Sequence, residues 1–360
     1  MRISDILKAL VISVFISACN TDNDPPHTPE TSSTERSFYA KGADVSWCTQ
    51  MEADGMRFFN SAGQERECME LMKETGMNSI RLRVWVNPLD GWCGKDDVLD
   101  KALRAKALGM KLMIDFHYSD TWADPGKQNP PAAWYGYSSE QIRKALEDHT
   151  ESTLNILKNN NIEVGWVQIG NEVNSGMLHP YGKVQGTDAG DFVSLFNAGS
   201  RKVRKIYPEA KVILHLSNGH DPQLYTWFMN TVHGVEYDMI GMSIYPSWNT
   251  GSGWTDWRPA AQSCISNIKS VSKTFGKPVM ICETGMPATE ALMARDAMEY
   301  LIRETAAIPE CHGIFYWEPE VYGGWKPDYY DDLGWASYNM GAFSDGKPTM
   351  ALDPFKQDIK

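Results

Sequence analysis

Short apolar runs alternate with longer amphipathic segments along most of this chain. The short runs have the length and composition of buried strands and are expected at 38–45, 78–86, 111–117, 164–170, 210–217, 238–245, 278–283 and 312–317. Apolar residues spaced three or four positions apart predict helices between them, for example at 64–75, 96–108, 139–160, 189–206, 258–275 and 289–306. This alternation predicts one α/β domain, a (β/α)8 TIM barrel. An open doubly wound sheet is the alternative, but no GxGxxG follows the first strand.

The barrel hypothesis predicts which strand side chains face the axis, because successive residues of a strand point to opposite sides. Ile80, Leu82 and Val84 would pack against the helices, and the inward set would be Arg81, Arg83, Trp85, Asp115, His117, Gly241, Ser243 and Tyr245. In the seventh strand Val279, Ile281 and Glu283 would share one side. A polar interior at the C-terminal ends of the strands is typical of barrel active sites. A single buried ion pair between Arg81 and Asp115 is the alternative for those two residues.

Two of the predicted strands end on a glutamate. One run leads into Asn171-Glu172, and another ends on Glu283 before Thr284-Gly285. A buried carboxylate costs several kcal/mol unless it is paired, so two such strand ends indicate chemistry. Retaining glycoside hydrolases use a carboxylic acid and a carboxylate nucleophile about 5–5.5 Å apart. We assign the acid/base role to Glu172 and the nucleophile role to Glu283.

Neighbouring residues have the chemistry that this assignment needs. Asn171 is placed to bind the sugar hydroxyl next to the reacting carbon, and Tyr245 to donate a hydrogen bond to Glu283. A guanidinium, from Arg83 or Arg81, would keep Glu283 ionised. Strict alternation would turn Asn171 away from Glu172, so both reach the cleft only if the strand end carries a bulge.

The charge and the residue counts narrow the classes of partner. A net charge of −12 argues against nucleic acid and against an anionic membrane surface. Core packing accounts for most of the thirteen Trp and fifteen Tyr, and the rest suit stacking on sugar rings. The eight histidines form no HxxxH or similar ligand pattern, so neither a metal nor a cofactor is expected. We expect a monomer.

The N-terminal segment has the composition of an export signal. Residues 1–18 combine a basic start with an apolar run that is too short to span a membrane. The run ends in Ile16-Ser17-Ala18-Cys19, which resembles a bacterial lipobox, so we expect lipid on Cys19. An ordinary cleaved signal with a chance cysteine is the alternative.

Residues 19–37 have no apolar pattern and are expected to form a flexible tether, which leaves 38–360 as the catalytic domain. We therefore expect an exported protein anchored by lipid to the outer membrane. The acidic Asp22 and Asp24 favour the cell exterior. Six other cysteines match no zinc spacing. Among them Cys48 and Cys93 are the first pair to test for a disulfide, and Cys282 is expected to be a free core thiol.

Several motifs resemble those of one enzyme family. Asn-Glu on the fourth strand and Glu on the seventh are similar to the clan of retaining (β/α)8 glycosidases. Within that clan the chain resembles glycoside hydrolase family 53, the endo-β-1,4-galactanases that cut arabinogalactan side chains of pectin. The matching stretches are Gly42-Ala43-Asp44-Val45-Ser46, Arg81-Leu82-Arg83-Val84-Trp85, Asp115-Phe116-His117-Tyr118-Ser119-Asp120-Thr121-Trp122-Ala123-Asp124-Pro125, Gln168-Ile169-Gly170-Asn171-Glu172, Ser243-Ile244-Tyr245-Pro246, Glu283-Thr284-Gly285 and Gly313-Ile314-Phe315-Tyr316-Trp317-Glu318-Pro319.

The resemblance implies roles for individual residues. It gives Glu172 and Glu283 the acid/base and nucleophile roles, with β-1,4-galactan and galacto-oligosaccharides as substrates. It places six residues along the cleft: Trp85, His117, Asp120, Trp122, Tyr245 and Trp317. Side-chain parity separately supports Trp85, His117, Tyr245 and Trp317. Asp120 and Trp122 rest on the resemblance, and the alternative for them is a capping Asp and a packing Trp.

The chain departs from the family in its loops. Some bacterial relatives bind calcium in an Asp-, Asn- and His-rich loop after the nucleophile, which is missing here, so no calcium is expected at that place. Short loops after strands six and seven predict an open cleft that favours short oligosaccharide products. Two alternatives remain: a clan relative that cuts β-mannan, β-glucan or β-xylan, and a lipid-anchored glycan-binding protein without catalysis.

Overall fold

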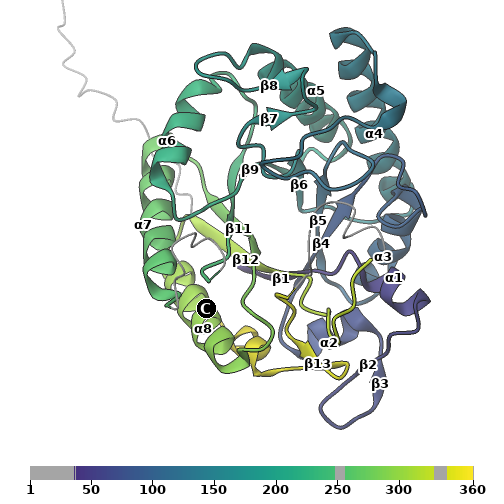
Figure 1. Ribbon diagram of the computed structural model, residues 1–360, viewed down its shortest axis with the longest axis vertical. Coiled ribbons are helices and arrows are strands. Elements are labelled where there is room, and N and C mark those ends of the chain that lie inside the picture. Colours follow the sequence, from purple (N-terminus) through teal and green to yellow (C-terminus); the bar gives the residue numbers. More distant parts are fainter. Residues whose placement is uncertain (1–35, 37, 248–255, 328–338, 360) are drawn as a thin grey trace, which may run out of the picture. The chain divides into compact units, whose positions relative to one another are not determined.

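Eight parallel strands close into a barrel. The computed structural model describes residues 36, 38–247, 256–327 and 339–359, all within one compact unit, Thr34–Lys360. The strand order is β1-β12-β11-β10-β9-β6-β5-β4 (Figure 1). The strands span β1 Ala40–Asp44, β4 Ser79–Val84, β5 Lys111–Phe116, β6 Trp166–Ile169, β9 Lys211–Leu216, β10 Met239–Ile244, β11 Val279–Thr284 and β12 Cys311–Trp317. The predicted (β/α)8 barrel is confirmed. The predicted signal peptide, Cys19 and all of the predicted tether except Arg36 lie outside the described residues.

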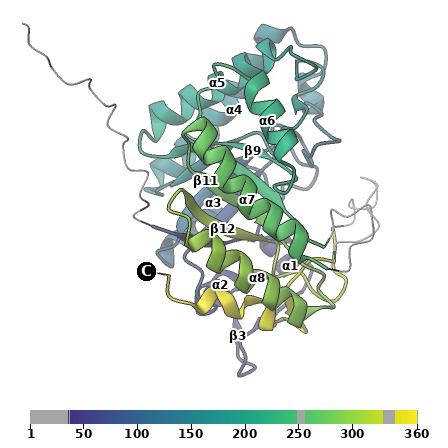
Figure 2. The same ribbon diagram turned by 90° about the vertical axis from the view of Figure 1, so that its left-hand side faces the viewer.

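Helices surround the barrel, and α7 and α8 run side by side along β10 to β12 (Figure 2). The helices span α1 Cys48–Ala53, α2 Cys68–Glu74, α3 Lys95–Ala107, α4 Ser139–Asn159, α5 Gly190–Ile206, α6 Pro222–Thr231, α7 Arg258–Phe275 and α8 Ala291–Ala306. The sequence pattern missed the short α1 and α6. The cap signal of α6 was nevertheless present, since Asp221 accepts from the first turn and Pro222 follows it. No helix in the described part of the chain has the length and apolar character needed to cross a membrane.

Small elements decorate the loops. Three two-stranded sheets pair β2 (Phe58–Phe59) with β3 (Glu65–Arg66), β7 (Gly176–Met177) with β8 (Gly182–Lys183), and β13 (Phe343–Ser344) with β14 (Lys347–Pro348). Short 3-10 helices cover Ala132–Trp134 and Met350–Lys356. The helix expected from residue 64 therefore begins only at Cys68, because β3 occupies its first predicted residues.

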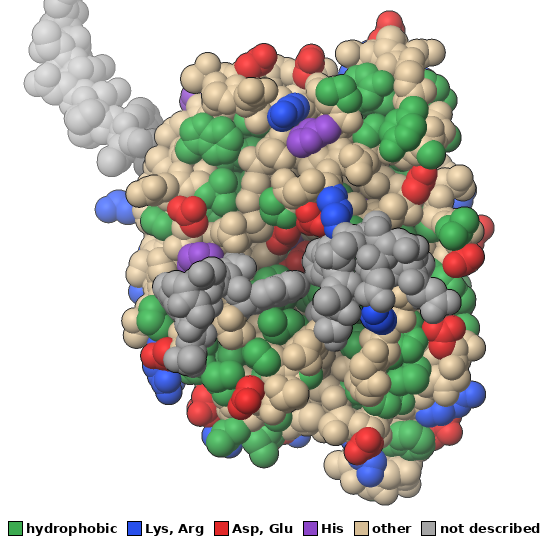
Figure 3. All heavy atoms as spheres, in the orientation of Figure 1, with side chains coloured by type: hydrophobic (Ala, Val, Ile, Leu, Met, Phe, Trp, Pro, Cys, Tyr) green, Lys and Arg blue, Asp and Glu red, His purple; other side chains and the backbone are tan. Residues whose placement is uncertain are grey.

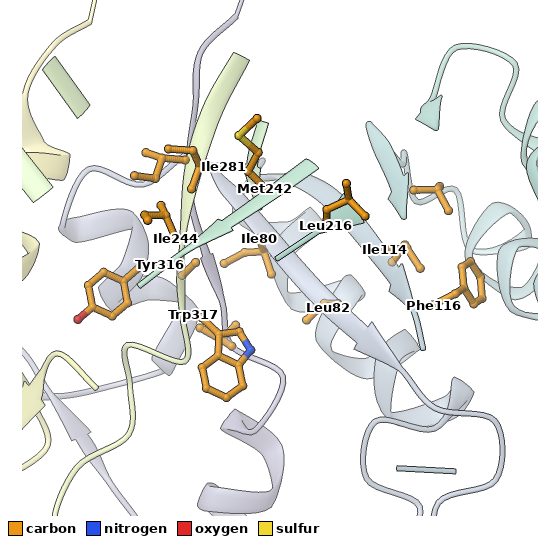
Figure 4. Close-up of a cluster of buried hydrophobic side chains, with 14 of the residues drawn as sticks. Ile80, Leu82, Ile114, Phe116, Leu216, Met242, Ile244, Ile281, Tyr316 and Trp317 are labelled. Atoms are coloured by element: carbon orange, nitrogen blue, oxygen red, sulfur yellow. The ribbon is translucent and has the colours of Figure 1, made fainter. Parts of the chain in front are cut away.

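Strand side chains alternate between two apolar layers. Ile80, Leu82, Ile114 and Phe116 belong to the outer core, against the helices (Figure 4). A separate cluster fills the barrel interior with Ala40, Met113, Trp166, Ile213, Met239, Met280, Cys282 and Phe315. The predicted inward side chains Arg81 and Asp115 are fully buried, and Asp115 follows the cluster residue Met113 by two positions along β5. Apolar side chains therefore fill the part of the barrel interior next to these polar residues.

The predicted parity of the seventh strand is wrong. Val279 and Ile281 belong to the outer core, while Met280 and Cys282 face the interior. The register of β11 shifts against both neighbours: Met242 pairs with Ile281 and Ser243 pairs with Glu283. This irregularity turns the adjacent Cys282 and Glu283 to the same side. Glu283 reaches the interior through an extra residue, not through alternation.

At the end of β6 a turn, and not a register shift, directs the glutamate toward the barrel mouth. The strand stops at Ile169, and Gly170 then adopts a φ of 81°. Glu172 follows with a φ of 45°, a left-handed conformation that is uncommon for a residue with a side chain. This turn, in place of the expected bulge, delivers both Asn171 and Glu172 to the barrel mouth.

The cysteines are buried thiols. All six within the described residues are free, including Cys48 and Cys93, so the suggested disulfide between them is absent here. Cys282 is a free core thiol, as predicted.

Candidate active site

A cavity of about 360 Å3 opens at the C-terminal end of the strands. Acidic side chains gather in a hollow near the centre of this face (Figure 3). Seven of the ten predicted site residues line the cavity: His117, Trp122, Asn171, Glu172, Tyr245, Glu283 and Trp317. The other three, Arg83, Trp85 and Asp120, do not line it. Both glutamates therefore share one space, whose walls come from the ends of several strands.

Arg81 organises the polar layer below the cavity. Its Nη1 donates to Asp44 at 2.6 Å, and its Nη2 donates to Asp115 at 2.9 Å and to Glu283 at 2.7 Å. The same Nη2 reaches Asn171 Oδ1 at 3.0 Å. The buried ion pair with Asp115 exists, but it is one part of this larger network. Of the two arginines considered for Glu283, Arg81 is therefore the charge partner.

Glu283 is buried but electrostatically supported. Burial is the largest influence and raises the pKa of its carboxyl, an effect that the Arg81 guanidinium opposes and the Asp115 charge adds to. The Tyr245 hydroxyl donates to Glu283 Oε2 at 3.0 Å and also favours the ionised form. Tyr245 thus has the contact predicted for it.

Glu172 lies in an environment that favours its proton. Burial raises the pKa of this carboxyl well above its ordinary value, and the nearby charge of Glu283 raises it further. Arg81 lowers it, but only as the weakest of the main influences. The pKa of Glu172 is therefore raised more strongly than that of Glu283, and such an inequality is what a general acid beside a carboxylate nucleophile needs.

Asn171 is held by hydrogen bonds with Arg81 and with the Ala123 carbonyl, and it lies against His215. Its Oδ1 accepts from Arg81 and contacts His215 Nδ1 at 2.9 Å, while its Nδ2 donates to the Ala123 carbonyl at 2.8 Å. Gln128 supports the adjoining backbone by donating to the Asn171 carbonyl at 2.9 Å. These contacts fix the amide at the cavity wall beside Glu172.

Arg83 lies behind the cavity instead of in it. Its guanidinium pairs with Glu318 at 2.8 Å and stacks over the rings of Trp122 at 4.3 Å and Trp85 at 5.0 Å. The substrate contact expected for Arg83 therefore has no basis in its position, because the side chain is 1 % exposed. Arg81 and Arg83 share one strand face, and only their depth in the barrel separates their roles.

Glu318 connects this arginine to a second buried carboxyl. It accepts from the Trp47 backbone N–H at 3.2 Å, and its charge raises the pKa of the buried Glu320 carboxyl. Burial raises the pKa of Glu318 to about 7, with the Asp44 charge adding and Arg83 opposing, and burial raises the pKa of Glu320 well above its ordinary value. The two glutamates therefore hold protons at pH values where exposed carboxyls are ionised.

Aromatic rings form the wall between Arg83 and the cavity. Trp122 packs edge-on against Trp317 at 5.8 Å and against Trp85 at 5.3 Å, and Tyr245 packs edge-on against Trp317 at 6.2 Å. Trp85 Nε1 donates to His117 Nδ1 at 3.3 Å. Trp122, Trp317 and Tyr245 present surface to the cavity, whereas Trp85 supports them from behind.

Asp120 has a structural role in the loops. Its carboxylate accepts from the backbone N–H groups of Asn87 at 3.0 Å and Ala132 at 2.9 Å. It therefore ties the loop after β4 to the long segment after β5, as expected for a capping Asp, and lies off the cavity wall. Trp122, by contrast, does line the cavity.

Several site residues had no role in the sequence prediction. The cavity is also lined by Asp124, Lys127, Ser217 and Asn218, and the polar layer below includes Asp44, Gln168 and His215. His215 had a visible signal, because it is the one polar side chain within the run Val212–Leu216. Within the described ranges no group of three or more His, Cys, Asp or Glu could hold a metal ion.

Known proteins match this chain over most of its length. The description of the matching family is glycosyl hydrolase family 53, and the match covers residues 40–355. An endo-beta-1,4-galactanase of Bacillus subtilis is 32% identical over 317 residues, covering 78% of this chain and 70% of the relative. An arabinogalactan endo-beta-1,4-galactanase A of Aspergillus niger is 30% identical over 304 residues, covering 78% and 84%.

A solved fungal beta-1,4-galactanase superposes with a TM-score of 0.76 at 29% identity, covering 89% of this chain and 99% of that one. The matched span of 40–355 contains both cavity glutamates, the Arg81 guanidinium that binds Glu283, and the aromatic wall. On these grounds the chain belongs to glycosyl hydrolase family 53.

Proposed function

We propose that this enzyme hydrolyses internal β-1,4-galactosidic bonds of galactan and type I arabinogalactan, with net retention at the anomeric carbon. The observation that carries the proposal is the unequal pair of carboxyls in one cavity: Glu283 bound by Arg81 and Tyr245, and Glu172 with a strongly raised pKa. The galactanase names of the relatives support the choice of galactan.

In the first step Glu283 attacks the anomeric carbon, while Glu172 gives its proton to the departing glycosidic oxygen. A covalent glycosyl–enzyme forms and the leaving oligosaccharide departs. In the second step the ionised Glu172 takes a proton from water, which attacks the same carbon and frees Glu283. The Asn171 amide, held by Arg81, is positioned for the hydroxyl beside the reacting carbon.

Product analysis on pure β-1,4-galactan tests the proposal, with wild type beside Glu172→Gln and Glu283→Gln. The wild type should release galactose oligomers, and both variants should lose activity by several orders of magnitude. Early products followed by ¹H NMR should carry the β-anomeric configuration of the substrate. Cleavage of mannan, glucan or xylan in place of galactan would contradict the substrate. Binding to galactan without cleavage would make the protein a capture module.

We further propose that the cleft accepts soluble galacto-oligosaccharides and yields short products. Only Gly285–Glu290 separates β11 from α8, while 248–255 of the loop after β10 lie outside the described residues. Grafting a longer loop after β11 should lengthen the products, and an unchanged product pattern would refute the idea.

We also propose export with a lipid anchor on Cys19, facing the cell exterior, and action as a monomer. Cys19→Ala should move the protein from the membrane fraction to the soluble fraction, and external protease should digest the anchored wild type in intact cells. Light scattering of the protein without residues 1–37 should give the monomer mass. A membrane-bound Cys19→Ala protein, or a dimer mass, would contradict these points.

A further inference from the structure

A line of buried hydrogen bonds crosses the barrel from Arg81 to β10. Arg81 Nε donates to Gln168 Oε1 at 2.7 Å, and Gln168 Nε2 lies 2.8 Å from His215 Nδ1. His215 Nε2 lies 2.9 Å from Ser243 Oγ. Ser243 and Glu172 both line the cavity, where the Ser243 side chain lowers the pKa of the Glu172 carboxyl as a hydrogen-bond partner. The line thus begins at the cation that binds Glu283 and ends at the other glutamate of the cavity.

The chemistry of its first member sets the direction of the whole line. A guanidinium only donates, so the Gln168 oxygen faces Arg81 and the Gln168 amide nitrogen faces His215. That nitrogen donates, so His215 Nδ1 accepts. A neutral imidazole carries its one proton on the other nitrogen, and Nε2–H therefore donates to Ser243 Oγ. The Ser243 hydroxyl proton is then left for Glu172.

The other groups around His215 favour the same tautomer. The Glu172 backbone N–H also points at Nδ1, at 3.4 Å, so two donors face this nitrogen. One acceptor, Asn171 Oδ1, lies 2.9 Å away, but it already has a donor in Arg81. Burial and the charge of Arg81 keep the pKa of His215 well below its usual value, so the ring stays neutral.

We propose that Ser243 and His215 are positioning residues that set the proton affinity and orientation of the Glu172 carboxyl. His215 fixes the direction of the Ser243 hydroxyl, and the hydroxyl donates to the ionised carboxylate. The inference rests on the proposed acid/base role of Glu172.

The Ser243 hydroxyl favours the ionised form of Glu172, whereas several neighbouring groups favour the protonated form. The charges of Glu283 and Asp124 disfavour an ionised Glu172, Arg81 favours it, and His215 is neutral. The remaining titratable groups on the same cavity wall are Lys127, His117 and Tyr245. Glu172 must release its proton in one step and recover one in the next. A hydrogen bond to the ionised form keeps that exchange possible in a site where burial opposes charge.

Three variants separate the contributions of this line. Ser243→Ala removes the donor to Glu172. His215→Gln places an amide N–H near the position of Nε2 and keeps the donor to Ser243, whereas His215→Asn keeps an acceptor near Nδ1 and loses that donor. Ser200→Ala is the matched control, because Ser200 is also a fully buried serine, on α5, whose hydroxyl donates to the Glu236 carbonyl.

Two readouts apply to each variant: the pH profile of kcat/KM, and a ¹³C NMR titration of labelled Glu side chains, with Glu172 assigned through Glu172→Gln. Ser243→Ala and His215→Asn should raise the pKa of Glu172, and with it the alkaline limb of the profile, by about one pH unit. His215→Gln and Ser200→Ala should leave the pKa of Glu172 and the alkaline limb of the profile at their wild-type values. Ser243→Thr, which retains the hydroxyl, should restore the wild-type value.

An unchanged Glu172 pKa in Ser243→Ala would overturn the proposal, as would equal shifts in His215→Gln and His215→Asn. Should Ser243→Ala fail to fold, the two His215 variants still decide the matter. The NMR titration needs no substrate. A wild type inactive on galactan would therefore refute the proposed function, while the role of Ser243 would still be measured.

Discussion

The Arg81 guanidinium lies 2.7 Å from the Glu283 carboxylate, and the same nitrogen donates to Asn171, the residue before Glu172. One buried cation thus contacts Glu283 and the strand end that carries Glu172. It also binds Asp44 and Asp115, so three carboxylates share a single positive charge. The charges of Asp44 and Asp115 oppose the ionised form of Glu283, and Arg81 and Tyr245 favour it.

Arg81→Lys should lower kcat/KM at least about 100-fold, because an ammonium cannot reproduce five contacts of a planar fork. The acid limb of the pH profile should move to higher pH, since Arg81 lowers the pKa of Glu283. Arg104→Lys is the control, as Arg104 forms its ion pair with Glu52 on the surface. An acid limb at the wild-type position would show that Arg81 does not control the charge of Glu283.

Gly170→Ala should reduce kcat about 10- to 100-fold by displacing Glu172. A methyl group there would lie 2.6 Å from Val173 Cγ1, at a φ of 81° that costs about 1–2 kcal/mol for other residues. Gly276→Ala, at a φ of 63° with open space around it, should cost similar stability and leave kcat unchanged. Thermal unfolding beside steady-state kinetics makes the comparison. Equal kcat losses in both variants would contradict the explanation.

Asp120→Ala should lower the free energy of unfolding by about 1–3 kcal/mol, because two backbone N–H groups lose their acceptor. Its KM for galactan should remain within about two-fold of wild type, since Asp120 lies off the cavity wall. Trp122→Ala, in contrast, should raise KM. A large KM effect with unchanged stability in Asp120→Ala would restore the substrate contact expected from the sequence.

The free energy of unfolding should fall as the pH rises from about 4.5 to 7. Glu318 binds its proton up to about pH 7 when folded but loses it near 4.5 when unfolded, so its contribution is complete below 4.5 and lost through 7. Glu320 acts in the same direction over a range that extends higher. Each group adds at most about 1.4 kcal/mol per pH unit.

Urea unfolding at pH 5, 6, 7 and 8 measures this decline, and Glu320→Gln should make it shallower. Glu151→Gln is the control, because two lysines hold the pKa of the exposed Glu151 at about 2, below the window. If the free energy of unfolding falls equally with pH in Glu320→Gln and in the wild type, Glu320 is ionised in the folded protein.

The sequence predicted the barrel and both glutamates because their signals are local. Each strand is a short apolar run, and a glutamate at the end of such a run is visible without any contact information. The choice between Arg81 and Arg83 as the partner of Glu283 needed information on tertiary contacts. The two have the same parity, and only the depth of each side chain, next to Asp115 or next to Trp122, distinguishes an active-site cation from a supporting one.

The irregularities of the backbone could not be predicted from the alternation of inward and outward residues. Alternation assumes a regular strand, so it misplaced Val279 and Ile281, and it offered a bulge where Gly170 and Glu172 make a left-handed turn. His215 could have been found from the sequence, because it is the one polar residue of the run Val212–Leu216. Gln128 and Lys127 lie on a loop whose course no periodicity describes.

The register shift in β11 has a consequence for protein engineering. Glu283 owes its direction to the register shift between Ile281 and Glu283, so a neighbouring strand that paired with β11 in an unshifted register would turn the carboxylate toward the helices. Chimaeras that join half-barrels from different glycosidases should therefore take β10 and β11 from the same parent. A junction between them would join two registers that were never matched, even where every catalytic side chain is retained.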